Sequence, residues 1–101
     1  MLLSNEGPLG LPTELDSIHN YYEGLVFNAI QEKLPDQYGS TDYIADIACI
    51  ALNDLPPRYI RHDVDMAFFL SSNDRQTMAA QVDKAVSKAI TFVNDSKNHK
   101  P

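Results

Sequence analysis

Residues 41–72 read TDYIADIACIALNDLPPRYIRHDVDMAFFLSS, and this stretch has two contrasting halves. The segment 43–52 follows a cap signal at 39–42 and is apolar on almost every side of a helix, with Asp46 as its single charge. A helix of this kind is usually buried over most of its surface. Pro56 and Pro57 then end the helix and force an extended stretch. The sequence therefore predicts a buried helix followed by an irregular connector.

Two further helices are predicted, one on each side of this stretch. Upstream, apolar residues recur every three or four positions from Thr13 to Leu34, where Thr13 and Asp16 resemble a capping box and Pro35 ends the helix. Downstream, Ser72 is expected to cap a helix with a core-facing stripe of Met78, Val82, Ala85, Val86, Ala89, Ile90 and Val93. The predicted fold class is mainly α, with three principal helices and an irregular or short extended connector, including extended structure at 58–61, between the second and third.

The length of 101 residues corresponds to one domain. We expect a disordered lead-in at 1–12, a single helical domain at 13–94 and a flexible tail at 95–101. Two helices in so short a chain can scarcely cover the apolar second helix completely, so the sequence also predicts a homodimer.

The composition argues against several classes of binding partner. The formal net charge is −6, which works against binding long nucleic acid through its phosphates. No window approaches the roughly 20 apolar residues of a membrane span, and the N-terminus does not resemble a signal peptide. The single cysteine forbids an internal disulfide and a multi-cysteine zinc site. We therefore expect a cytoplasmic protein that binds neither long nucleic acid nor membrane.

The connector collects groups suited to a small anionic ligand. Arg58, Arg61 and His62 lie within five residues, Tyr59 lies between them and Asp63 follows. Arginine can bind phosphate or a guanine edge with two parallel hydrogen bonds, a tyrosine ring can stack on a base, and a carboxylate can accept hydrogen bonds from guanine. These are the parts of a guanine-nucleotide site. The alternative is that the two arginines only neutralise nearby aspartates in a solvated loop.

Other chemistries are less well supported. His62, Asp63 and Asp65 have no second histidine or cysteine nearby, and adjacent residues of an extended segment point to opposite sides, so no metal site is predicted. Cys49 lies in the most apolar helix, where a cysteine is usually an inert core residue. The chain has no glycine-rich phosphate loop and no paired-carboxylate motif. We expect no enzymatic activity and no cofactor.

Three further groups in this region have structural interpretations. Asp46 could pair with Arg58 if the diproline segment folds back along the helix end. Asn53 could share that surface or, as the simpler interpretation, cap the end of the helix in a left-handed conformation. The side chains expected in the core or in a dimer interface are Met66, Phe68 and Phe69.

The run from Asp46 to Tyr59, DIACIALNDLPPRY, resembles the signature of the late competence development protein ComFB family, and residues 20–26, NYYEGLV, are similar to the family's first helix. The resemblance covers roughly residues 14–93. It implies a small, mainly helical, dimeric cytosolic protein without enzymatic activity. It further implies a candidate receptor for cyclic di-GMP that influences competence, motility or cell size.

The resemblance also bears on individual residues. It implies ligand-binding roles for Asn53, Arg58 and Tyr59, which match the motif; Arg61, His62 and Asp63 are our physical extension of that site. Arg75 is added because helix N-termini attract phosphate. Some relatives hold zinc through cysteines before the second helix, but residues 39–43 contain no cysteine, so no zinc is expected.

Two functions therefore remain open at this stage. One is a cyclic di-GMP receptor that signals to an unidentified effector protein. The other is a ligand-independent helical module that docks on a partner through the second helix or through Phe68 and Phe69.

Overall fold

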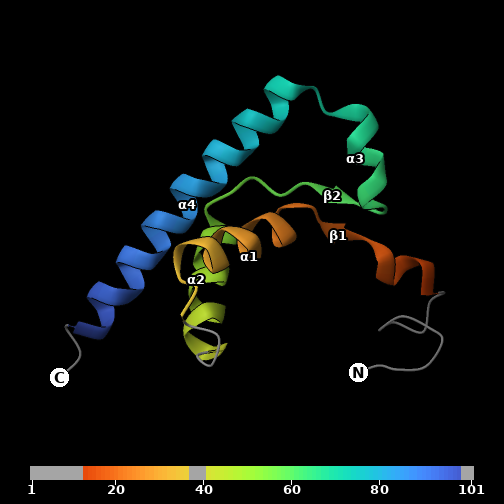
Figure 1. Ribbon diagram of the computed structural model, residues 1–101. Helices are drawn as coiled ribbons and strands as arrows, with labels where there is room; N and C mark the ends of the chain where they lie inside the picture. Colours follow the sequence, from red (N-terminus) through yellow and green to blue (C-terminus); the bar gives the residue numbers. More distant parts are fainter. Residues whose placement is uncertain (1–12, 37–40, 99–101) are drawn as a thin grey trace.

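The computed structural model describes residues 13–36 and 41–98. The elements in chain order are the 3-10 helix η1 (Thr13–Ser17), strand β1 (His19–Asn20), helix α1 (Tyr22–Lys33), helix α2 (Thr41–Asn53), strand β2 (Tyr59–Ile60), helix α3 (Asp63–Phe69) and helix α4 (Ser72–Asn98) (Figure 1). The mainly α fold is confirmed, although the described ranges hold four α-helices where three were predicted. None of these helices is both long and apolar enough to cross a membrane.

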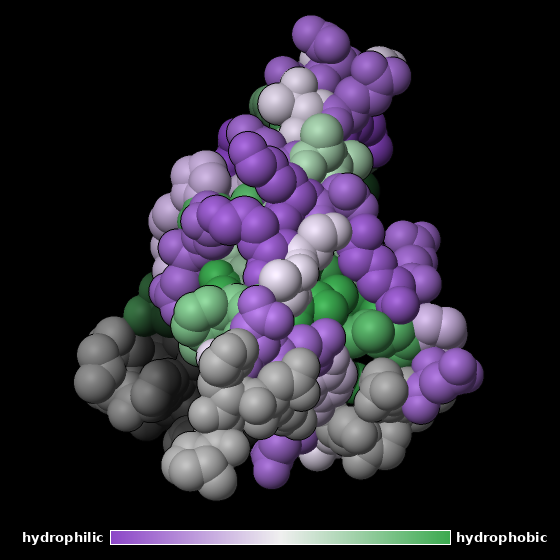
Figure 2. Space-filling view, turned by 90° about the vertical axis from the view of Figure 1, so that its left-hand side faces the viewer, coloured by the Kyte–Doolittle hydropathy of each residue, from purple (hydrophilic) through white to green (hydrophobic). Residues whose placement is uncertain are grey.

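Helices α1, α2 and α4 pack against one another and form the body of the molecule. Its largest fully buried side chains are those of Val26, Ile30, Ile47 and Val86. Burying one such side chain contributes about 1.5–3 kcal/mol, so this core is the main source of stability. On the face shown in Figure 2, hydrophilic side chains predominate and apolar surface shows only between them.

Helix α4 confirms the predicted stripe. Its buried or half-buried residues are Met78, Val82, Ala85, Val86, Ala89, Ile90 and Val93. The predicted cap at Ser72 is wrong by one residue. The Ser71 hydroxyl accepts a hydrogen bond from the Asp74 amide (3.0 Å), and the Asp74 carboxylate accepts one from the Ser71 amide (3.3 Å), which forms a reciprocal cap. The helix continues to Asn98, into the segment expected to be a tail.

The predicted first helix is divided into three elements. Only Tyr22–Lys33 is α-helical, and the residues before it form η1 and β1. Leu15 and Ile18, which continue the apolar period, are about half exposed. The prediction failed here because His19 and Asn20 pair with residues far along the chain. The end of the helix before Pro35 is confirmed, whereas the proposed capping side chains at 13 and 16 lie outside the described side chains.

Helix α2 is confirmed over Thr41–Asn53, and the cap residues at 39–40 lie outside the described ranges. Within one chain, the expected burial over most of its surface is not reached. The residues buried on this helix, all on the side toward α1 and α4, are Ile47, Ala48 and Ala51. Asp46 and Cys49 are exposed, so Cys49 is not the core residue that the sequence predicted. Within one chain, two packed neighbours cover only one side of this apolar helix.

The connector between α2 and α4 contains β2, as predicted for 58–61, and then α3, which is an additional helix. The Asp65 amide donates to the His62 carbonyl at its start, and the Leu70 amide donates to the Met66 carbonyl at its end. Met66 is buried, as expected for a core residue. Phe68 and Phe69 are exposed and do not belong to the core of this chain.

Candidate functional site

The connector is joined to the start of the chain by a two-stranded antiparallel sheet. Strand β1 pairs with β2 in a register that sets His19 opposite Ile60 and Asn20 opposite Tyr59. The predicted irregular connector therefore has a fixed position, because its extended residues are one strand of a sheet.

Asn20 fixes the backbone of this sheet at the position of Arg58. The Asn20 side-chain oxygen accepts hydrogen bonds from the Arg58 amide (3.0 Å) and from the Tyr22 amide (3.2 Å). The Arg58 carbonyl in turn accepts a hydrogen bond from the Tyr21 amide (2.7 Å). Both backbone groups of Arg58 are thus bound, and its guanidinium group is presented from a fixed point.

Three exposed side chains follow one another on this support, and we call Arg58, Tyr59 and Arg61 the connector ridge. The Tyr59 ring is 68% exposed. The Arg61 Nε donates to the Ser17 hydroxyl (3.1 Å), which orients the guanidinium group without neutralising it. No described acidic residue forms an ion pair with either arginine, so the predicted alternative of arginines neutralised by nearby aspartates does not describe this arrangement.

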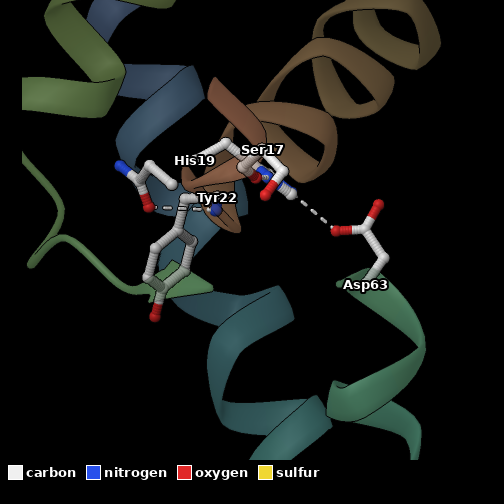
Figure 3. A network of polar contacts seen from close by, with 5 residues as sticks. Ser17, His19, Tyr22 and Asp63 are labelled. Atoms are coloured by element: carbon white, nitrogen blue, oxygen red, sulfur yellow. Dashed lines mark hydrogen bonds and ion pairs between the residues drawn. The ribbon is translucent and has the colours of Figure 1, made fainter. Parts of the chain in front are cut away.

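His19 and Asp63 form a clamp beside the ridge (Figure 3). The His19 Nδ1 faces the Ser17 carbonyl and Nε2 faces the Asp63 carboxylate, both at 2.8 Å. Both partners are acceptors, so both ring nitrogens can donate only in the protonated imidazolium. The hydrogen bond to the Ser17 carbonyl, followed by that to Asp63, raises the pKa of His19 above 6.5. Asp63 is thus engaged by a histidine of the N-terminal segment.

The other candidate residues lie in different surroundings. Asn53 is at the end of α2, where its side-chain amide donates to the Cys49 carbonyl (3.0 Å), so it bonds to its own helix. Arg75 is in the first turn of α4 and donates to the carbonyl of Ala67 (3.4 Å). His62 is exposed and directly precedes α3. The structure therefore brings together the connector ridge and Asp63, and places Asn53 and Arg75 on other elements.

One further expectation can be checked against the structure. Asp46 and Arg58 are both exposed, and no ion pair between them is present. The folding-back of the diproline segment onto Asp46 is therefore wrong; the segment leads away to β1. Among the described residues, no three His, Cys, Asp or Glu side chains come together as a metal site requires.

Sequence reasoning missed the three residues that hold the ridge in place: Ser17, His19 and Asn20. Each acts through a partner about 40 positions away, 44 for the bond between His19 and Asp63 and 38 for that between Asn20 and Arg58. The only hint in the sequence that one of these residues matters was that Asn20 is the first residue of the NYYEGLV element.

The body carries a separate hollow between α1 and α4, which we call the α1–α4 cleft. Its volume is about 460 Å³. Its apolar lining residues are Tyr21, Leu25, Ala29, Leu70, Met78, Ala79 and Val82, and its polar ones are Asn28, Glu32, Arg75 and Asp83. Arg75 thus belongs to this cleft and lies apart from the ridge.

Comparison with known proteins adds one finding. The family model described as late competence development protein ComFB matches residues 19–97, which include both strands, helices α1 to α3, helix α4 up to its last residue but one, and the ridge. Searches of curated proteins and of solved structures find no match. Because the match spans well over half of the chain, this protein belongs to the ComFB family of late competence development proteins.

Proposed function

We propose that this protein is a non-catalytic regulator that binds cyclic di-GMP at the connector ridge. Family membership supports a regulatory role in competence. The choice of cyclic di-GMP as the ligand is based on the chemistry of the ridge and on what the resemblance to this family implies. The observation that carries the proposal is that two arginines flank an exposed tyrosine on a short strand whose position is fixed by its pairing with β1.

The ridge is suited to a dianion for electrostatic reasons. The chain carries a net charge of −6, yet the guanidinium groups of Arg58 and Arg61 are not paired with any described carboxylate. A phosphate that reaches these guanidinium groups does not have to displace a carboxylate, although Arg61 Nε also donates to the Ser17 hydroxyl. Hydrogen bonds between a guanidinium and a phosphate are charge-assisted and about twice as strong as neutral ones.

We assign different roles to the three side chains. Tyr59 lies in β2, and Arg58 and Arg61 flank this strand along the chain. We expect a guanine to stack on Tyr59 while its phosphate meets Arg61. Arg58 then binds the second half of the ligand across the edge of the strand.

Calorimetry of the full chain with cyclic di-GMP tests the proposal. We expect Arg61→Ala to weaken binding at least tenfold, about 1.4 kcal/mol, because a charge-assisted contact is lost. Tyr59→Leu should weaken binding by about 1–3 kcal/mol through the loss of stacking. Lys84→Ala is the matched control, because it removes one exposed positive charge from α4 and should leave the affinity within twofold.

Two results would contradict the proposal. One is the absence of heat with cyclic di-GMP at micromolar protein concentrations in several buffers. The other is an equal loss of affinity for Arg61→Ala and Lys84→Ala, which would indicate unspecific attraction of an anion. GTP and the linear dinucleotide serve as competitors, since only the cyclic ligand presents two fixed phosphates to both sides of the ridge.

A further inference from the structure

The α1–α4 cleft lies apart from the connector ridge and has the size of a ligand site. Helix α4 projects beyond α1 toward α3 (Figure 1), and residues between 75 and 83 line the cleft on the α4 side. The volume of about 460 Å³ is within the range of about 300–1,000 Å³ that is usual for small-molecule sites in proteins. An apolar hollow of this size with a few polar groups is therefore a candidate binding site.

The walls of the cleft are apolar and only partly covered. Met78 and Val82 of α4 are buried, whereas Leu25 and Ala29 of α1 and Leu70 before α4 are half-buried. A ligand that covers the half-buried side chains removes apolar surface from water, which favours binding. The walls therefore provide an attraction for an apolar body that does not depend on charge.

The lining of the cleft favours a flat aromatic ligand. The Tyr21 ring and the Met78 thioether are favourable neighbours of an aromatic ring. Ala29 and Ala79 have small side chains, so a flat ring can come close to the backbones of both helices. A cavity of about 150 Å³ can hold one benzene ring, so a cleft of about 460 Å³ has room for two fused rings.

The charged groups of the cleft are separated by sign along α4. Arg75 is in the first turn of this helix, and Asp83 follows eight residues later, which corresponds to about 12 Å along the helix axis. Lys33 bonds to Asp83 (2.6 Å), so the last turn of α1, which contains Glu32, lies near this end of the cleft. No described cation forms an ion pair with Glu32. The cleft therefore has a positive end at Arg75 and a negative end at Glu32.

Arg75 is available to an anionic ligand. A guanidinium group has five N–H donors, and the Arg75 Nη2 donates to the Ala67 carbonyl at 3.4 Å, a long hydrogen bond. No described carboxylate forms an ion pair with this arginine. A carboxylate that enters the cleft can therefore form two parallel hydrogen bonds with the guanidinium group without displacing another anion.

We propose that the α1–α4 cleft is a second ligand site and that it binds a small aromatic monocarboxylate. The carboxylate binds Arg75, and the rings lie between Leu25 and Met78. The far end of the ligand is neutral, because Glu32 repels a second anionic group there. The site does not include the connector ridge, so it does not depend on the binding of cyclic di-GMP.

Three naphthalene compounds test these requirements by calorimetry with the full chain. Naphthoate has one carboxylate and should bind with a saturable isotherm. Naphthalenemethanol has the same rings but no charge, and should bind at least tenfold more weakly because the contact with Arg75 is no longer an ion pair. Naphthalene dicarboxylate, with its acids at opposite ends of the rings, should also bind more weakly than naphthoate. Glu32→Gln should reduce this last difference, because it removes the repulsion at the far end.

Matched pairs of variants test whether naphthoate binds in the cleft. Arg75→Gln should weaken binding at least tenfold, whereas Lys84→Gln, which removes an exposed charge of α4 outside the cleft, should leave the affinity within twofold. Ala79→Phe should fill the cleft and abolish binding. Ala80→Phe adds the same ring at an exposed position outside the cleft and should leave binding unchanged. Circular dichroism checks that each variant keeps its helices.

Three results would overturn the proposal. The first is the absence of saturable naphthoate binding up to millimolar ligand. The second is an equal loss of affinity for Arg75→Gln and Lys84→Gln, and the third is unchanged binding to the folded Ala79→Phe chain. Binding of naphthoate by a chain that gives no heat with cyclic di-GMP would support the cleft site and contradict only the function proposed for the ridge.

Discussion

The body and the connector of this molecule are stabilised in different ways. In the body, α1, α2 and α4 enclose side chains such as Val26 and Val86, which are fully buried. In the connector, strand β2 and helix α3 are held mainly by polar contacts at or near the surface, through Asn20, His19 and Arg61. Regions held by few buried contacts open with less free energy than the core. The part of the chain that contributes least to stability thus carries the exposed arginines and aromatic rings.

The largest expected effect is a core truncation in the body. Ile47 is completely buried between the helices, so Ile47→Ala loses apolar burial and leaves a cavity. We expect the free energy of unfolding to fall by about 2–5 kcal/mol, as measured by urea denaturation at fixed protein concentration. Phe92→Ala, at an exposed position, should change it by less than about 0.5 kcal/mol. Similar losses at both positions would contradict the proposed division between core and surface.

A smaller loss of stability is expected for a substitution at the junction between the connector and the body. Asn20→Ala removes the acceptor shared by the Arg58 and Tyr22 amides, which should cost about 1–2 kcal/mol. The Arg58 amide should then exchange its hydrogen faster, whereas amides in the core of α4 should change much less. Asn20→Asp keeps an acceptor oxygen and should restore most of the protection. Equal loss of protection throughout the chain would show that the connector and the body unfold as one unit.

The smallest expected effect is the pH dependence of the His19–Asp63 clamp. The pKa of His19 is raised in the folded protein, so protonation favours the folded state. This contribution is complete below the unfolded pKa of about 6.5 and is lost as the pH rises through the folded value. NMR titration should give a His19 pKa above 6.5, and Asp63→Asn should lower it. An unchanged value in Asp63→Asn would show that Ser17 alone supports the imidazolium.

The helices of the body could be predicted because their apolar residues follow the helical period. The same rule extended the first helix too far, since Leu15 and Ile18 continue the period without a proline or glycine to interrupt it. The apolar composition of α2 also led to a wrong prediction. Cys49 was expected to be buried because its neighbours are apolar, but within one chain only the side toward α1 and α4 is covered.

The candidate site was only partly predictable. The extended segment at 58–61 could be expected from Pro56 and Pro57. The short helix α3 could not, since His62 offers no side-chain cap at its start. The clamp between His19 and Asp63 joins residues 44 positions apart, and no local pattern reports such a contact. Contacts of this kind depend on how the helices pack, which a single sequence does not show.

The pairing of β1 with β2 has a consequence for the order of folding. The two strands are about forty residues apart, and each contributes only two residues. Closing a chain segment of that length costs entropy that so few hydrogen bonds can scarcely offset. Once α1 and α2 have packed, the strand ends are already close and the cost falls. We therefore expect the sheet to form after the helical core and to open before it, so that early folding intermediates have helices but no ordered connector ridge.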